Sequence, residues 1–254
     1  LTSIGMKLSE LSVVITRPQA QSRSLKQKLD ALGCHTISCP CIQIKALSPQ
    51  RVRSALTQPL SSYDLICFTS PNSVTHGLTA LPELEQLPAS TQLAAVGKTT
   101  AHALRAQGLH NITVPEVKKD SEGLLAILAQ QPLAGMTGLI IKGMGGRELL
   151  RIALQQRHCT VTTLDVYQRL LPEHPVLLPD HIDVIMFTSS ESAENFITLS
   201  ATSDQQHLLT CQTLVGHPRI GEKVASLGFK KLPIIAASPA DQDMLTALQH
   251  WAAT

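Results

Sequence analysis

Hydroxyl groups directly follow two apolar runs of this sequence, in a position where they could bind an anion. Thr69 and Ser70 come after Leu65–Phe68, and Thr188 and Ser189 come after Val184–Phe187. At the junction of a strand and a helix, such side chains commonly cap the helix, because their oxygens accept amide hydrogens of its first turn. Amides and hydroxyls at a helix start also bind carboxylate or phosphate. Both interpretations remain open, and the repetition favours two copies that face one ligand.

A second candidate anion site is the turn Val96-Gly97-Lys98-Thr99-Thr100. It is similar to part of a nucleotide-binding P-loop, but no glycine lies five residues before Gly97, so the full motif is absent. Gly97 allows close approach of the backbone, and the positive end of the following helix favours a carboxylate. We therefore expect Thr99 and Thr100 to bind an anion other than a nucleotide.

The segment Lys142–Glu148 has three glycines in four positions after an apolar run. Gly145 allows close approach of a ligand to the backbone, and Arg147 stands where a helix is expected to begin. The spacing is similar to half of a dinucleotide-binding motif, but that motif requires glycine at position 148, where the chain has glutamate. We expect no cofactor here, although a nucleotide-dependent enzyme that uses this loop remains an alternative.

Other catalytic classes have weaker support. The six cysteines include no C-x-x-C pair, and the ten histidines form no zinc-protease motif, so no metal site is predicted. Tyr167, one of only two tyrosines, is expected to end a strand at Val166, where its hydroxyl would reach solvent. No Ser-His-Asp set or pair of acids stands out.

Composition excludes several partners. A net charge of +2 and 3% aromatic residues do not suggest a nucleic-acid binder. No apolar run approaches the roughly 18 residues that would cross a bilayer, and residues 1–10 do not resemble a secretion signal. We expect a soluble, cytoplasmic protein without nucleic-acid or membrane partners.

The elements that would position these residues occur twice. Residues 64–70 return as 183–189, Val96-Gly97 returns as Val215-Gly216, and residues 13–15 resemble 139–141. Strands and helices alternate within each copy, which predicts an α/β fold with two similar parallel-sheet domains. Such sheets bind ligands at the carboxyl ends of their strands.

The apolar patterns give the following elements. Strands are expected at 11–16, 65–69, 92–96, 111–114, 138–142, 161–166, 184–188, 213–215 and 234–236. Helices are expected at 19–32, 72–79, 99–107, 121–130, 147–157, 190–199, 220–227 and 241–251.

Several of these motifs resemble, in the same order, those of the uroporphyrinogen-III synthases. They are Leu11–Pro18, Phe68–Asn72, Val96–Ala101, Gly143–Leu150, Val166–Arg169 and Phe187–Ser189. The resemblance extends from about residue 11 to about residue 248. It implies a cleft between the two domains and a two-stranded β connection. Domain one would comprise residues 1–42 plus 172–254, and domain two residues 43–171.

The resemblance also implies a reaction. The substrate would be hydroxymethylbilane, a linear tetrapyrrole with eight carboxylate arms. Loss of its terminal hydroxyl gives an azafulvene, and a spiro intermediate inverts ring D to give uroporphyrinogen III in haem biosynthesis. Without enzyme the bilane closes to the uninverted isomer, so placement of the chain is the main task. A monomer with transient contact to the upstream deaminase is implied as well.

The resemblance assigns candidate roles to particular residues. Tyr167 matches the recurrent tyrosine of the family and would assist departure of the hydroxyl. The proposed substrate-binding residues are Arg17, Thr69, Ser70, Thr99, Thr100, Gly145, Arg147, Thr188 and Ser189. Two positions depart from the pattern. His217-Pro218-Arg219 replaces a hydroxyl pair, and Lys142 replaces a common arginine, so a point charge replaces a bidentate group. A non-enzymatic protein that binds an anionic metabolite remains the alternative.

Overall fold

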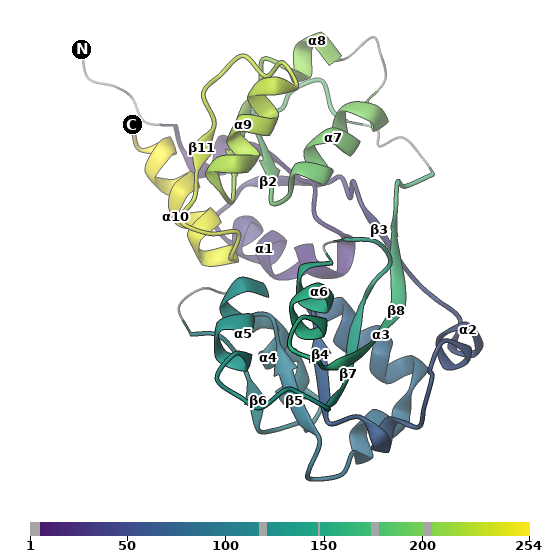
Figure 1. The fold of residues 1–254 in the computed structure, drawn as a ribbon. Helices are drawn as coiled ribbons and strands as arrows, with labels where there is room; N and C mark the ends of the chain where they lie inside the picture. Colours follow the sequence, from purple (N-terminus) through teal and green to yellow (C-terminus); the bar gives the residue numbers. More distant parts are fainter. Residues whose placement is uncertain (1–5, 117–120, 147, 174–177, 201–204) are drawn as a thin grey trace. The chain divides into compact units, whose positions relative to one another are not determined.

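The computed structural model divides the chain into two compact units (Figure 1). It describes residues 6–116, 121–146, 148–173, 178–200 and 205–254. Unit 1 consists of Leu1–Gln43 and Leu170–Thr254, and unit 2 consists of Ile44–Arg169. The chain therefore enters unit 2 once and leaves it once. Arg147 lies outside the described residues.

The described residues of unit 1 form a five-stranded parallel sheet in the order β11-β10-β9-β1-β2. Its strands are β1 (Ser12–Ile15), β2 (His35–Ser38), β9 (Val184–Phe187), β10 (Gln212–Val215) and β11 (Ile234–Ile235). All residues of β9 and β10 are buried. Strands buried on both faces explain the continuous apolar runs in the sequence.

Helices cover both faces of this sheet. They are α1 (Gln19–Ala31), α7 (Ser190–Leu199), α8 (Gln205–Leu208), α9 (Pro218–Ser226) and α10 (Asp241–Ala252), with a short 3₁₀ helix at Leu8–Glu10. Val13 and Ile15 pack in one core with α1 and α10, whereas Val14 packs in a second core with α7 and α9. Alternate residues of a strand point to opposite faces, so a short run such as β1 contributes to both cores.

The described residues of unit 2 form a sheet in the order β3-β8-β7-β4-β5-β6. The strands are β3 (Gln43–Ala46), β4 (Leu65–Phe68), β5 (Gln92–Ala95), β6 (Ile112–Thr113), β7 (Thr137–Gly143) and β8 (Thr160–Leu170). Strands β4 to β8 run parallel. The neighbouring strands β3 and β8 also carry the chain from one unit to the other, which makes the connection two-stranded.

Unit 2 repeats the layered packing. Its helices are α2 (Pro49–Ser54), α3 (Pro71–Ala80), α4 (Lys98–Ala106), α5 (Ser121–Leu128) and α6 (Leu149–Gln155), with 3₁₀ helices at Leu60–Ser62 and Pro82–Gln86. Ile66 and Phe68 pack with α3 and α4, whereas Leu65 and Cys67 pack with α5 and α6. Burial raises the pKa of the Cys67 thiol to about 12. This cysteine is therefore a protonated core residue.

The two sheets have the same strand order when matched by the sequence repeat. In strand order, β2, β1, β9, β10 and β11 of unit 1 correspond to β8, β7, β4, β5 and β6 of unit 2. Unit 1 forms its β1–β2 pair first, and unit 2 forms the corresponding β7–β8 pair last. The units are therefore circular permutations of each other. In this order the strand connections reverse direction between β1 and β9, and between β7 and β4. Parallel sheets bind ligands at such points.

The α/β class and the predicted elements are confirmed, with boundaries that differ by a few residues at most sites. The expected end of a strand at Val166 is wrong, because β8 continues through Tyr167 to Leu170. The amide of Leu47, just after β3, donates a hydrogen bond to the Val166 carbonyl over 3.0 Å. Strand β3 thus gives β8 a neighbour on its outer edge, which supports the extension. Among the described residues, no helix is both long and apolar enough to cross a membrane.

Candidate functional site at the carboxyl ends of the strands

A pocket of about 320 Å³ lies where β7 and β4 end in unit 2. This is a point at which the strand connections reverse, so the fold itself predicts a ligand site here. The residues that line the pocket include both polar and cationic side chains: Thr69, Ser70, Ser121, Lys142, Arg151, Tyr167 and Arg169. Gly143 to Gly146 and Glu148 line it too.

Tyr167 lies at the edge of this pocket and is only 1% exposed. A bulge in the pairing of β7 and β8 places it opposite Gly143. Its ring occupies the space that a side chain on Gly143 would need: an added Cβ would lie 2.5 Å from the ring carbon Cζ. Its hydroxyl lies 3.1 Å from the Ser70 hydroxyl. His76 contacts the ring from α3, and burial lowers the pKa of His76, which favours its neutral form.

Ser70 has two roles in this arrangement. Its oxygen accepts the Ser73 amide hydrogen over 3.0 Å and so caps α3. The Ser73 hydroxyl in turn accepts from the Ser70 amide, also over 3.0 Å. The same Ser70 oxygen contacts Tyr167. The capping interpretation of this hydroxyl is therefore correct, and the cap also holds a partner of the tyrosine in place.

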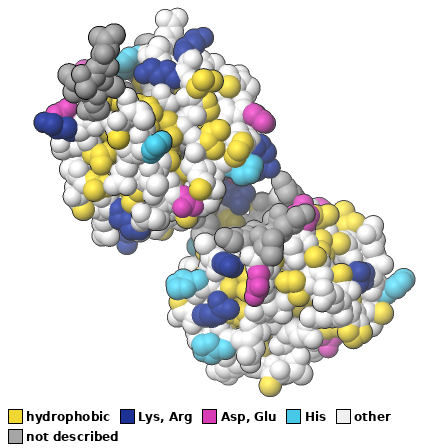
Figure 2. Space-filling view, turned by 90° about the vertical axis from the view of Figure 1, so that its left-hand side faces the viewer, with side chains coloured by type: hydrophobic (Ala, Val, Ile, Leu, Met, Phe, Trp, Pro, Cys, Tyr) yellow, Lys and Arg dark blue, Asp and Glu magenta, His cyan; other side chains and the backbone are white. Residues whose placement is uncertain are grey.

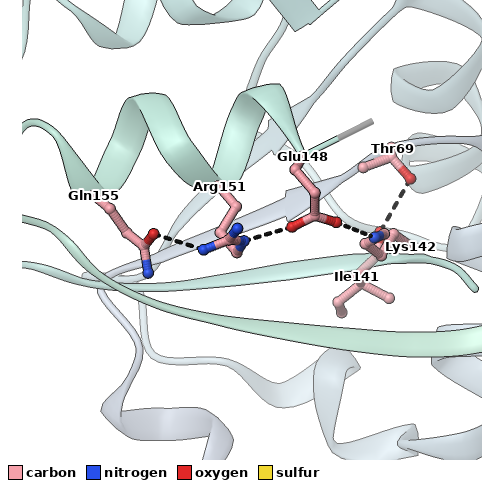
Figure 3. A network of polar contacts seen from close by, with 6 residues as sticks. All are labelled: Thr69, Ile141, Lys142, Glu148, Arg151 and Gln155. Carbon is pink, nitrogen blue, oxygen red and sulfur yellow. Dashed lines mark hydrogen bonds and ion pairs between the residues drawn. The ribbon is translucent and has the colours of Figure 1, made fainter. Parts of the chain in front are cut away.

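Three charged side chains that line the pocket, Lys142, Glu148 and Arg151, are linked to one another by ion pairs (Figure 3). Lys142, in β7, lies 3.0 Å from one carboxylate oxygen of Glu148. The other oxygen lies 2.5 Å from Nε of Arg151, and Arg151 donates to Gln155 over 2.8 Å. Glu148 is the N-cap residue of α6, and Arg151 and Gln155 follow it within the helix at the i+3 and i+4 spacings that bring side chains together. Sequence reasoning missed Glu148 and Arg151, although this spacing was a visible signal.

Unit 1 has a pocket of about 620 Å³ at the ends of β9 and β10. Thr188 and Ser189 line it, together with His217 and Arg219. Ser189 caps α7 by accepting from the Ser192 amide over 3.0 Å, as Ser70 does in unit 2. His217 caps α9 through its Nδ1 atom, which accepts from the Arg219 amide. The residue that replaces the expected hydroxyl thus still caps the helix.

The other predicted ligands lie in different surroundings. Arg17 is 8% exposed, and its guanidinium donates to the Pro239 carbonyl and lies 2.5 Å from a carboxylate oxygen of Asp241. Thr99 is exposed in the first turn of α4, while Thr100 is buried against the core. Gly145 has a φ of 75° in the pocket loop. The pocket thus brings together Thr69, Ser70, Gly145 and Tyr167. The ligand roles themselves stay predictions.

On the face drawn in Figure 2, lysine and arginine side chains do not form one large basic area. Figure 2 shows lysine and arginine side chains dispersed singly or in small groups among uncharged ones on this face.

Comparison with known proteins identifies relatives over nearly the whole chain. A model of the family described as uroporphyrinogen-III synthase HemD matches residues 23–246. The uroporphyrinogen-III synthase of Salmonella typhimurium is 30% identical over 248 residues, which cover 94% of this chain and 100% of the relative. That of Proteus mirabilis is 32% identical over 165 residues, 65% of this chain and 83% of the relative.

Solved structures support the fold. A uroporphyrinogen III synthase mutant from Thermus thermophilus matches with a TM-score of 0.64 at 18% identity, over 95% of this chain and 98% of that one. The enzyme from Helicobacter pylori matches with a TM-score of 0.62 at 14% identity, over 94% of this chain and 99% of that one. On the family match and the Salmonella relative together, the chain belongs to the uroporphyrinogen-III synthase family.

Proposed function

We propose that this lyase converts hydroxymethylbilane to uroporphyrinogen III with a proton supplied by Tyr167. The observation that carries this proposal is the position of the phenol: it lies at a pocket between two strand ends, fixed by Ser70 and by the absence of a side chain at Gly143. A proton donor must be placed within hydrogen-bond reach of the departing group. The substrate would therefore bring its terminal hydroxymethyl group to the edge of the pocket at Tyr167.

The first step breaks a carbon–oxygen bond. Tyr167 gives its phenolic proton to the hydroxyl, water leaves, and the pyrrole nitrogen, which keeps its hydrogen, supplies the electron pair that forms the protonated azafulvene. In the productive arrangement Ser70 donates its hydroxyl hydrogen to the Tyr167 oxygen, which leaves the phenolic hydrogen for the substrate. The substituted carbon of ring D then attacks the azafulvene carbon, and the spiro intermediate opens and recloses with ring D inverted. The proton lost in reclosure can return to the phenolate.

The remaining task is to hold the curled substrate through its carboxylate arms. The proposed ligands are Arg17, Thr69, Ser70, Thr99, Thr100, Gly145, Arg147, Thr188 and Ser189. Of these, Ser70 and Ser189 cap the helices that follow β4 and β9, and helix starts of this kind favour anions. Holding reactive groups in position is a large part of many rate enhancements. We expect a cytoplasmic enzyme that receives the bilane from the deaminase before it closes spontaneously.

The activity is tested by isomer analysis. The purified chain is coupled to a deaminase fed with porphobilinogen, and the oxidised products are separated into type I and type III porphyrins. We expect mostly type III, in proportion to the amount of this protein. Only type I porphyrin from folded protein would contradict the proposed function.

The proton-transfer role is tested by Tyr167→Phe. General acid catalysis contributes factors of about 10²–10⁴, so we expect kcat to fall by about 10²-fold or more, with KM within about twofold of the original. The matched control is Tyr63→Phe, which removes the hydroxyl of the other buried tyrosine, a partner of Thr57. It should leave kcat unchanged. A Tyr167→Phe variant with an unchanged kcat would show that Tyr167 donates no essential proton.

A further inference from the structure

The lysine in the pocket is already paired with an anion that belongs to the chain. The Lys142 side chain is 13% exposed, whereas that of Glu148 is 43% exposed. The ammonium nitrogen of Lys142 lies 3.0 Å from a carboxylate oxygen of Glu148, the more exposed side chain of the pair (Figure 3). Glu148 thus already provides Lys142 with a carboxylate partner inside the pocket.

Glu148 is also shared between two cations. Its second oxygen lies 2.5 Å from Nε of Arg151, so one carboxylate bridges a lysine from β7 and an arginine from α6. Arg151 retains a second partner, because it also donates to Gln155. These two cations hold the pKa of Glu148 below its usual value, Arg151 through the stronger bond. Glu148 is thus negatively charged at neutral pH.

We propose that Glu148 occupies the position of a substrate carboxylate on Lys142 and is displaced when the substrate binds. Glu148 is 43% exposed, and ion pairs with a partner in solvent contribute little to stability, so Lys142 can exchange one carboxylate for another at little cost. Glu148 keeps Arg151 as a partner after the exchange. Glu148 therefore competes with the ligand for Lys142, and this internal competition weakens the binding of any single carboxylate in the pocket. This inference rests on the proposed function, because that function supplies the carboxylate-bearing ligand.

The internal competitor has a use in this reaction. A substrate with eight carboxylates can bind tightly through many weak contacts, and its product carries the same number. A pocket that bound one carboxylate very strongly would hold substrate and product equally and would slow product release. Because Glu148 partly neutralises Lys142, the lysine binds a single carboxylate weakly. It then favours a ligand whose other carboxylates are bound elsewhere on the protein at the same time.

The inference is tested with Glu148→Gln and uroporphyrin III, a stable porphyrin with the eight carboxylates of the product. The dissociation constant is measured by fluorescence titration, and KM is measured in the isomer assay. Removal of the competing carboxylate should tighten binding of uroporphyrin III about threefold to fivefold and lower KM. The control Glu83→Gln removes the carboxylate of an exposed ion pair with Arg53, outside this pocket, and should change neither value.

Repeating the measurement in a chain that carries Lys142→Gln distinguishes displacement of Glu148 from Lys142 from simple repulsion between Glu148 and the ligand carboxylates. Lys142→Gln should weaken binding of uroporphyrin III, and in that background Glu148→Gln should lose at least half of its effect. An equal gain with and without Lys142 would show that Glu148 only repels the ligand, and this would overturn the inference. Weaker binding by Glu148→Gln would overturn it as well, because Glu148 would then be holding Lys142 in place for the ligand. No binding of the porphyrin by the original chain would also overturn it.

The two proposals fail separately. Tyr167→Phe should bind uroporphyrin III as the original chain does, because the phenol is proposed to act on the reacting atoms and Lys142 on a carboxylate arm. If Tyr167→Phe kept full activity, the predicted order of affinities for uroporphyrin III, with Glu148→Gln tighter and Lys142→Gln weaker than the original chain, would still be tested independently. If that order of affinities were not found, a fall in kcat for Tyr167→Phe would still support the proton-transfer role.

Discussion

The contact between Gly143 and Tyr167 shows how one missing side chain positions a reactive group. An added Cβ at position 143 would lie 2.5 Å from Cζ, 2.7 Å from Cε2 and 2.8 Å from the hydroxyl oxygen of Tyr167. Unlike Gly145 and Gly146, with φ values of 75° and 86°, Gly143 is not among the residues with positive φ. Glycine is therefore needed at 143 for space rather than for backbone conformation.

Gly143→Ala should consequently displace the tyrosine from the pocket. We expect kcat to fall at least about tenfold, because small displacements of reactive groups strongly reduce rates. Overpacking of this kind costs about 1–3 kcal/mol of stability, which a urea titration measures. Gly138→Ala, in the same strand, is the control: its Cβ would lie 3.2 Å from the Cys159 sulfur, away from Tyr167. Full activity in Gly143→Ala would show that the position of the ring is not critical.

At the scale of elements, each sheet has an aspartate directly before a central strand: Asp64 before β4, and Asp183 before β9. Asp64, before β4, accepts the Thr137 amide hydrogen of β7 over 2.7 Å. Asp183, before β9, accepts the Ser12 amide hydrogen of β1 over 2.8 Å. Each carboxylate thus satisfies an amide at the start of the neighbouring strand, at the edge of the sheet opposite the pockets. This explains why the aspartates are part of the repeated sequence.

The contribution of Asp64 should depend on pH. The Thr137 amide, and then its hydroxyl, lower the pKa of Asp64 below its usual 3.8. A lowered folded-state pKa means that the stabilisation is present above pH 3.8 and is lost as the pH falls through the lowered value. Asp64→Ala should therefore be less stable than the original chain at pH 7, and the difference should shrink below pH 3.8.

Urea unfolding at several pH values measures this difference. The control is Glu85→Ala, which removes an exposed carboxylate from the same unit and should have little effect at any pH. A constant difference between Asp64→Ala and the original chain from pH 7 to pH 3 would show that the charge of Asp64 is not what stabilises the strand pair.

For the whole molecule, the circular permutation explains how one chain builds two similar units from a repeat that is out of phase with them. Unit 2 is a continuous segment, Ile44–Arg169, and its two cores consist of residues within that segment. The cores cover both faces of the sheet, as an independent domain requires. The domain boundaries expected from the resemblance stay a prediction until the units are separated.

Residues 44–169 expressed alone should therefore fold. We expect a cooperative urea transition, followed by circular dichroism, and no formation of type III porphyrin, because this segment carries only part of the proposed carboxylate ligands. The full chain with the same measurements is the control. A broad, non-cooperative transition would show that unit 2 depends on the remainder of the chain.

The sequence by itself determined the elements with strong local signals. The apolar runs of β4 and β9 and the glycine after α1 could be recognised because buried parallel strands and helix ends have local patterns. Strands β2 and β3 were missed because their residues are mixed in polarity and mostly exposed or half-buried. The hydroxyls after β4 and β9 were identified, since their positions follow from the strands before them.

Only the tertiary structure decided which of these residues lie together. Ser70 and Tyr167 are 97 positions apart and meet because β4 and β8 both lie next to β7. Arg17, in a family motif, is directed to Asp241, 224 positions away. Lys142 and Glu148 are close in sequence, yet their pairing depends on how α6 returns over the end of β7. Local patterns specify strands and caps, whereas contacts between distant segments depend on strand order and on which sheet face a side chain occupies.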